Sequence, residues 1–156
     1  MKSVILTFWL SIMFLSGCYS SLQINLSKER LVPCPDSPNC VSSLSVNPRH
    51  SIDPFPVSSS GRESLVLLND IVRAMNGSEI LWTSERAFAA IFTTRLGFVD
   101  DVQFLLDEKA RVIHIRSASR VGYWDLGVNR KRMEAIRREY LSRIDTRGQN
   151  PTPQQQ

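Results

Sequence analysis

The sequence predicts an α+β fold: a helix, a four-stranded antiparallel β-meander and a second helix, preceded by a proline-rich segment. Three observations support this prediction. Apolar residues recur at helical spacing over about residues 61–76 and 130–144. Between these stretches, four short runs rich in β-forming residues alternate with turn residues. Ahead of the first helix, six prolines fall within residues 33–56, so residues 19–60 are expected to form a tether and loops.

The first predicted helix covers about residues 61–76. Ser60, followed three residues later by Glu63, matches a capping box at a helix start. Apolar residues then recur every three or four positions, and Gly77 favours a stop. The apolar residues of this stripe are Leu65, Leu68, Ile71, Val72 and Met75.

Four strands are predicted between the two helices. They are Ile80–Ser84, Phe88–Arg95, Phe98–Leu106 and Arg111–Ser119. The gaps between them are too short for crossover helices, so neighbouring strands should pair antiparallel.

The last two predicted strands have a definite expected register. If Asp107–Ala110 forms the turn between them, apolar residues of one strand face apolar residues of the other. The same register places Gln103 beside His114 and Asp101 beside Arg116. It therefore predicts a structural ion pair between Asp101 and Arg116.

The second predicted helix covers about residues 130–144. Asn129 is the expected N-cap. Four residues share one apolar stripe: Met133, Ile136, Tyr140 and Ile144. The polar residues 147–156 that follow are expected to form a disordered tail.

The first residues have the order of a secretory signal. Lys2 supplies a positive charge, Val4–Leu15 is an apolar run, and two small residues precede Cys18. The run is too short to span a membrane, which takes about 20 apolar residues. Leu15–Cys18 resembles the lipobox of bacterial lipoproteins, in which a diacylglyceryl group is attached to the cysteine sulfur before cleavage. We therefore expect a lipid on Cys18 to anchor the protein in a membrane; an ordinary signal with a chance cysteine is the alternative.

These features predict the organisation of the chain. It comprises a signal peptide over residues 1–17, a lipidated N-terminus and tether over 18–32, a single folded domain over 33–146, and the tail over 147–156. By resemblance to enterobacterial sorting, Tyr19 in place of Asp after the lipidated cysteine favours the outer membrane, facing the periplasm, over the inner membrane. Export also makes nucleic acid an unsuitable partner.

Basic residues gather in the C-terminal half of the chain. Residues 18–110 carry 8 basic and 11 acidic side chains, whereas residues 111–147 carry 10 basic and 4 acidic side chains. Such a half could face an anionic lipid, glycan or protein partner. A solvated helix face would give the same composition.

Two cysteines remain beside Cys18, and export places them in an oxidising compartment. Cys34 and Cys40 flank a segment rich in turn residues, which can fold back to allow a disulfide between them. Free thiols are an alternative. Zinc is a poorer one, because the cysteine spacing is too wide and His50 and His114 are too far apart for a ligand pair. We expect no metal and no cofactor.

An anion site is predicted where the last strand gives way to the second helix. Arginines offer two-pronged donors there, and a helix N-terminus presents free N–H groups. The candidates are Arg116, Ser117, Ser119, Arg120, Asn129 and Arg130. Hydrogen bonds that tie a polar loop to the sheet are the alternative role for these residues.

Three motifs resemble the bacterial "domain of unknown function 1499" family. They are the segment Pro33–Ser43, the segment Gly97–Phe104, and the segment from Arg116 to Arg130. The resemblance covers about residues 33–141, and one departure is Gln103, where an acidic residue is expected. The resemblance supports the domain limits and points to the same polar residues, but it implies no activity.

Two functions are consistent with these observations. The first is a non-enzymatic envelope module that binds an anionic lipid, glycan or protein partner. The second is a hydrolase or transferase with a polar site around Asp100, His114, Ser117 and Arg120. No nucleophile elbow and no phosphate-binding loop is present in the sequence, which favours the first. Asp100 and Asp101, as neighbours on a strand, should point to opposite faces and are poor candidates for a catalytic carboxylate pair.

Overall fold

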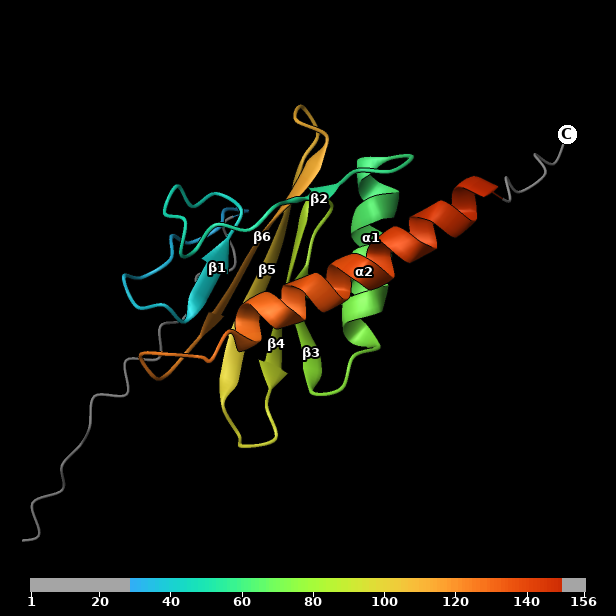
Figure 1. Cartoon of the computed structure of the whole chain (residues 1–156). Coiled ribbons are helices and arrows are strands. Elements are labelled where there is room, and N and C mark those ends of the chain that lie inside the picture. The colour runs from blue at the N-terminus through green and yellow to red at the C-terminus, as the bar shows by residue number, and fades with distance from the viewer. Residues whose placement is uncertain (1–28, 150–156) are drawn as a thin grey trace, which may run out of the picture.

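The structure, a computed structural model, describes residues 29–149 and is an α+β fold with one antiparallel sheet (Figure 1). The strands are β1 (Cys40–Ser42), β2 (Phe55–Pro56), β3 (Ser78–Thr83), β4 (Ala87–Thr93), β5 (Val99–Asp107) and β6 (Val112–Ser119); the helices are α1 (Gly61–Arg73) and α2 (Val128–Gln149). The predicted signal peptide, the lipidation site at Cys18, most of the tether and the end of the tail lie outside the described residues.

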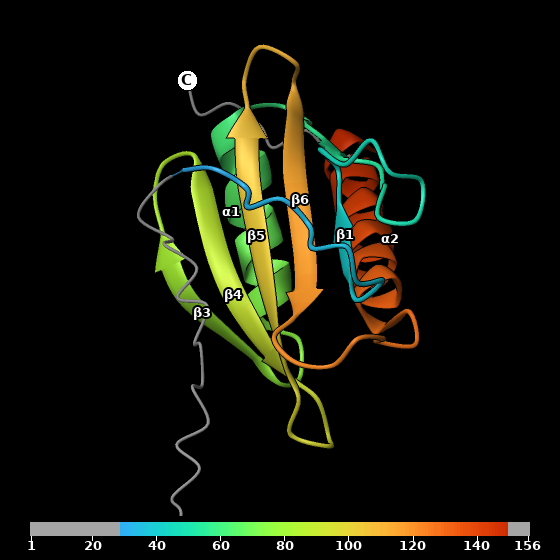
Figure 2. The ribbon, with the colours of Figure 1, turned by 90° about the vertical axis from the view of Figure 1, so that its left-hand side faces the viewer.

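The predicted meander is confirmed as the centre of a larger sheet. The strand order is β1-β6-β5-β4-β3, and β2 also pairs with β6. The prediction of only four strands was wrong, because β1 and β2 come from the proline-rich segment. Each is two or three residues long and pairs antiparallel with the edge that β6 would otherwise leave open. Both helices cover one face of the sheet (Figures 1 and 2).

The core lies between the helices and that face of the sheet. In α1, Ser60 is the N-cap and its hydroxyl accepts from the Glu63 amide, as the sequence predicts. Helix α1 ends at Arg73, three residues earlier than expected. In α2, Met133, Ile136 and Tyr140 are fully buried, which confirms the predicted stripe.

The turn after α1 lies directly against the end of β4. Gly77 has a φ of 77°, and a Cβ atom there would come within 2.5 Å of the Thr93 carbonyl oxygen. The Thr93 amide donates to the Gly77 carbonyl at 2.8 Å. Only glycine permits this approach without strain, and it brings the end of α1 beside β4.

The pairing of β5 with β6 differs from the predicted register by two residues. Gln103 pairs with Arg116, and Asp101 pairs with Ala118. The loop is 108–111 rather than 107–110, because Asp107 still pairs with Val112. A two-residue shift leaves every side chain on its expected face, so the core was predicted correctly although the partners were not.

The start and end of α2 also differ from expectation. The helix begins at Val128, so Asn129 lies inside its first turn and is not the N-cap. The Asp125 carboxylate accepts from the Gly127 and Asn129 amides, each at 2.9 Å, and takes that role. The helix continues to Gln149, so residues 147–149 are helical where a disordered tail was predicted.

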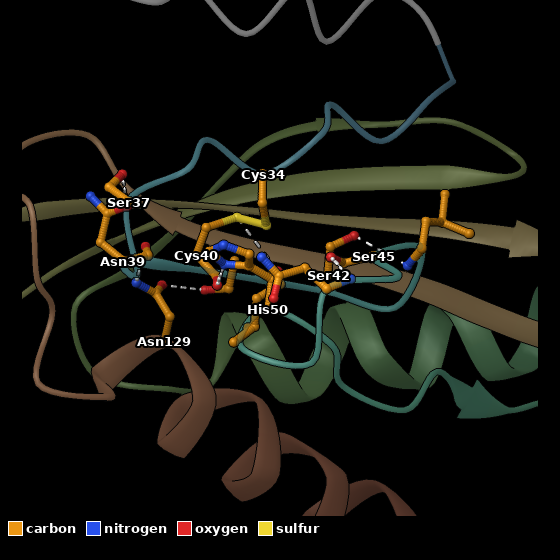
Figure 3. Close-up of a disulfide and its surroundings, with 12 residues drawn as sticks. Cys34, Ser37, Asn39, Cys40, Ser42, Ser45, His50 and Asn129 are labelled. Atoms are coloured by element: carbon orange, nitrogen blue, oxygen red, sulfur yellow. Dashed lines mark hydrogen bonds between the residues drawn. A yellow bond between two sulfur atoms is a disulfide. The ribbon is translucent and has the colours of Figure 1, made fainter.

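The other face of the sheet is crossed by residues 29–39, which we call the strap (Figure 2). Leu31 of the strap is buried, so ordered structure begins ahead of the predicted boundary at residue 33. The predicted disulfide between Cys34 and Cys40 is confirmed, and it joins the strap to β1. Figure 3 shows this disulfide next to His50, whose Nδ1 lies 2.9 Å from the Cys40 carbonyl oxygen.

Candidate functional site

Asp100 anchors a buried polar network on the helix side of the sheet. Its carboxylate accepts from Arg132 of α2 and from the Ser119 hydroxyl of β6. The side chains of Asp100 and Arg132 are only 3% and 8% exposed. The Arg132 guanidinium also lies over the Phe92 ring, 4.7 Å from its centroid. The ion pair therefore attaches the start of α2 to the beginning of β5, the central strand of the sheet.

Asn129 links the same network to the strap. Its side-chain amide nitrogen donates to the Asn39 carbonyl at 3.1 Å, to the Ser119 hydroxyl at 3.0 Å and to Asp125 at 2.9 Å. Its oxygen accepts from Ser117 and Arg132. Figure 3 shows Asn129 beside Asn39 and close to the disulfide. Three of the six predicted anion-binding residues therefore form hydrogen bonds within the protein. They are Ser117, Ser119 and Asn129, which connect β6, α2 and the strap.

Asp101 forms an ion pair on the strap side of the sheet, but with Arg120. Arg120 Nε lies 3.1 Å from both carboxylate oxygens, and its Nη2 lies 2.8 Å from one of them. The predicted partner, Arg116, stands two residues further along β6, opposite Gln103. The predicted Asp101–Arg116 pairing was therefore wrong, because the register is shifted.

Arg116 is buried on that same face. Its Nε and Nη1 atoms, and Oε1 of Gln103, have no hydrogen-bond partner among the residues that the structure describes. Burial lowers the pKa of the Arg116 guanidinium, and the nearby Asp101 carboxylate raises it in opposition. The paired strands thus bring two incompletely satisfied polar side chains together beneath the strap.

The remaining predicted residues lie apart from one another. Arg130 donates to the carbonyls of Arg49 and Ser51, on the loop before β2. His114 lies on the strap side of β6, with Nδ1 3.1 Å from the Ser43 hydroxyl. The six predicted anion-binding residues consequently do not form one pocket, and the anion at the start of α2 is the chain's own Asp125.

A groove that the sequence analysis did not single out lies between the end of α1, the end of β4 and the start of α2. Its volume is about 550 Å³. Its walls are formed by Met75, Asn76, Gly77, Phe92, Thr93, Thr94, Arg95, Val128, Lys131 and Arg132. Three of these ten residues are cationic and none is acidic, so the groove combines apolar walls with positive charge.

The cations of this groove reach it from two elements. Arg95 follows β4, while Lys131 and Arg132 belong to the first turns of α2. Helical periodicity could have identified Arg132, because it lies four residues ahead of the predicted core residue Ile136. No sequence signal places Arg95 beside α2, since that proximity depends on how the helix crosses the sheet.

Residues 29–149 contain neither a metal-ligand cluster nor a membrane-spanning helix. This part of the chain contains no cluster of three His, Cys, Asp or Glu side chains arranged to hold a metal ion. Neither of its helices is both long enough and apolar enough to cross a membrane.

Comparison with known proteins gives one match. The model of a family described as "Protein of unknown function (DUF1499)" matches residues 30–140. No curated protein and no solved structure matches the chain. The matched range contains β1 to β6, α1, most of α2, both ion pairs and the whole groove.

Proposed function

Because the chain belongs to the DUF1499 family of proteins of unknown function, we propose a function from its geometry: it is a lipid-anchored envelope module that binds an anionic amphiphile in the basic groove. The anchor is the lipid on Cys18, and the outer membrane, facing the periplasm, is the favoured location. The folded domain acts as a non-enzymatic binding module.

The observation that carries this proposal is the lining of the groove. Arg95 and Lys131 can donate charge-assisted hydrogen bonds to an acidic headgroup, and such bonds are stronger than those between neutral groups. Met75, Phe92 and Val128 offer an apolar surface to the rest of the ligand. The volume of about 550 Å³ lies in the range of small-molecule sites. Arg132 is paired with Asp100, so the positive charge available to a ligand comes from Arg95 and Lys131.

The hydrolase or transferase alternative is less consistent with the geometry. Asp100 and Ser117 are buried on the helix side of the sheet, at 2% and 0% exposure. Arg120 and His114 lie on the strap side, where each has a partner of its own. One substrate could not contact all four residues across the thickness of a sheet, so binding is favoured over catalysis.

The groove is tested with a short-chain lipid that stays monomeric in water. We expect the full chain, held in zwitterionic vesicles, to bind dihexanoyl phosphatidylglycerol in titration calorimetry and to bind the phosphatidylcholine analogue more weakly. Arg95→Ala or Lys131→Ala should each weaken binding about tenfold or more, because each removes a charge-assisted contact. Lys109→Ala, in the β5–β6 turn, is the matched control and should change nothing.

Two results of that titration would contradict the proposal that the groove binds an anionic amphiphile. One is equal affinity for both lipids, and the other is an affinity unchanged by both groove substitutions. Inorganic phosphate, titrated separately, shows whether the headgroup alone suffices.

The anchor has an independent test. Mass spectrometry of the membrane-extracted protein should show an acylated N-terminal Cys18, and Cys18→Ser should release the protein or leave it unprocessed. A soluble mature form that begins at another residue would exclude the anchor without affecting the groove.

A further inference from the structure

Two loops at one end of the sheet expose large apolar side chains. They are residues 94–98, between β4 and β5, and residues 120–127, between β6 and α2, and both views place them at the same end of the molecule (Figures 1 and 2). We call this the loop end. Its exposed side chains are Leu96 at 83%, Phe98 at 51%, Tyr123 at 75%, Trp124 at 68% and Leu126 at 66%. Several large apolar side chains exposed at one end of a fold are typical of an interaction surface.

Hydrogen bonds hold the longer of these loops in a fixed conformation. Asp125 accepts from the Gly127 amide, and the Asn39 side chain donates to the Gly122 carbonyl at 2.5 Å. Leu126 adopts a φ of 55°, which a leucine rarely takes. The apolar residues are therefore presented outward by a braced turn.

The charge around these side chains is positive. Arg95 lies in one loop, and Arg130 and Lys131 follow the other in the first turn of α2. Arg120 begins that second loop, but its charge is paired with Asp101. Asp125 is the only acidic residue in the two loops, and it is engaged by the start of α2. Exposed apolar and aromatic side chains with cations nearby in the chain suit a lipid bilayer, whose surface is anionic and whose interior is apolar.

The opposite end of the sheet has neither property. Its turns, residues 84–86 and 108–111, contain no aliphatic or aromatic side chain larger than alanine, and they mix Glu with Arg and Lys. The two ends are therefore chemically distinct, although both consist of loops that follow strands of one sheet.

We propose that the loop end docks onto an anionic lipid bilayer. Trp and Tyr concentrate at membrane interfaces, where an aromatic ring meets both headgroups and acyl chains. Leucine and phenylalanine side chains beside them enter the acyl region, and the surrounding cations contact anionic headgroups. The docking deepens the proposed envelope role and names the bilayer as a partner, but it does not depend on the groove.

The length of chain ahead of the strap allows this orientation. From Cys18 to Glu29 the chain advances eleven residues, which span at most about 40 Å when extended. Glu29 lies at the opposite end, where it accepts from the Ser84 hydroxyl at 2.7 Å. Strand β4, seven residues long, covers about 23 Å of the distance between the ends. A lipid on Cys18 can therefore enter the same bilayer that the loop end contacts.

The chain's tryptophans allow a direct test. Besides Trp9 in the predicted signal peptide, they are Trp82 on β3 and Trp124 at the loop end. Full-length Trp9→Phe/Trp82→Phe reports on Trp124, and Trp9→Phe/Trp124→Phe is the matched control that reports on Trp82. Each is reconstituted into vesicles that contain brominated phosphatidylglycerol, and quenching of tryptophan fluorescence is measured.

We expect at least twofold quenching of Trp124 and little quenching of Trp82. Replacing phosphatidylglycerol by phosphatidylcholine should reduce the Trp124 quenching, and so should Leu96→Ser/Leu126→Ser, whose side chains are exposed and whose fold circular dichroism can verify. Absent Trp124 quenching, or equal quenching of the two tryptophans, would overturn the proposal. Equal quenching in both lipids would overturn the anionic requirement. Arg95 and Lys131 belong to both the groove and the loop end, whereas Leu96 and Leu126 line no part of the groove. Loss of quenching in Leu96→Ser/Leu126→Ser with unchanged dihexanoyl binding therefore separates the docking from the groove.

Discussion

Asp100 and Asp101 are neighbours on β5, yet the structure gives them opposite environments. Asp100 faces the helices, and its partner Arg132 is 8% exposed. Asp101 faces the strap, and its partner Arg120 is 44% exposed. The carboxylates differ little in burial, so the contrast lies in the arginines. The alternation of side chains along a strand places the two carboxylates on opposite faces of the sheet. How much each ion pair contributes to stability depends on whether the helices or the strap cover that face.

Arg116 provides a third arginine environment for this comparison. It is buried like Arg132, but its Nε and Nη1 atoms lack hydrogen-bond partners among the described residues. Arg132 is thus buried and paired, and Arg120 is partly exposed and paired. Arg116 is buried, and its hydrogen bonds are incomplete within the described residues. The energetic contributions of the three arginines should differ in size and, for Arg116, in sign.

The largest effect is expected at Arg132. Arg132→Met should lower the free energy of unfolding by about 3–5 kcal/mol, because it leaves the Asp100 carboxylate buried without its counter-charge. Urea unfolding, followed by circular dichroism, measures the loss. The double variant Asp100→Asn/Arg132→Met should recover much of it, since no unpaired charge remains. A loss below about 1 kcal/mol in the single variant would show that this pair is not buried in solution.

Arg116 should respond in the opposite direction. Arg116→Met roughly keeps the side-chain volume and removes buried N–H donors that have no partner within residues 29–149. We therefore expect the free energy of unfolding to rise by about 1 kcal/mol. Asp101 retains its contacts with Arg120 in this variant. Arg116→Lys is the control that keeps the charge and should not be stabilised. A loss of more than about 1 kcal/mol in Arg116→Met would mean that the guanidinium is fully hydrogen-bonded in solution.

Local sequence patterns predicted most of the fold. Both amphipathic stripes, the N-cap at Ser60 and the meander follow from periodicity and turn residues. The strands β1 and β2 were missed because they are short and adjoin prolines. Their pairing depends on β6, which lies about 60–80 residues later in the chain. Nothing in their own sequence indicates that edge.

The polar site was less predictable for a related reason. The residues of the network were identified by type, but a register shift of two moved Arg116 from Asp101 to Gln103. Three consecutive basic residues, 130–132, have different roles that only the rotation of α2 separates: Arg130 contacts the loop before β2, Lys131 lines the groove, and Arg132 binds Asp100. The groove itself arises from the packing of three elements and has no counterpart in any local motif.

The smallest effect is expected at Arg120, and it completes the comparison of the two carboxylates. Arg120→Ala should lower the free energy of unfolding by at most about 1 kcal/mol, although it removes a two-pronged contact of good geometry. Water and salt reach the guanidinium, so its attraction to Asp101 is screened. When Arg120 is removed, hydration of the Asp101 carboxylate replaces most of the interaction energy of the ion pair. The effect should shrink further in 1 M salt, whereas the loss in Arg132→Met should persist. Urea unfolding at low and high salt measures both variants together. If Arg120→Ala were as damaging as Arg132→Met, exposure of the arginine would not be the property that separates the two ion pairs, and the strap would have to cover Arg120 in solution.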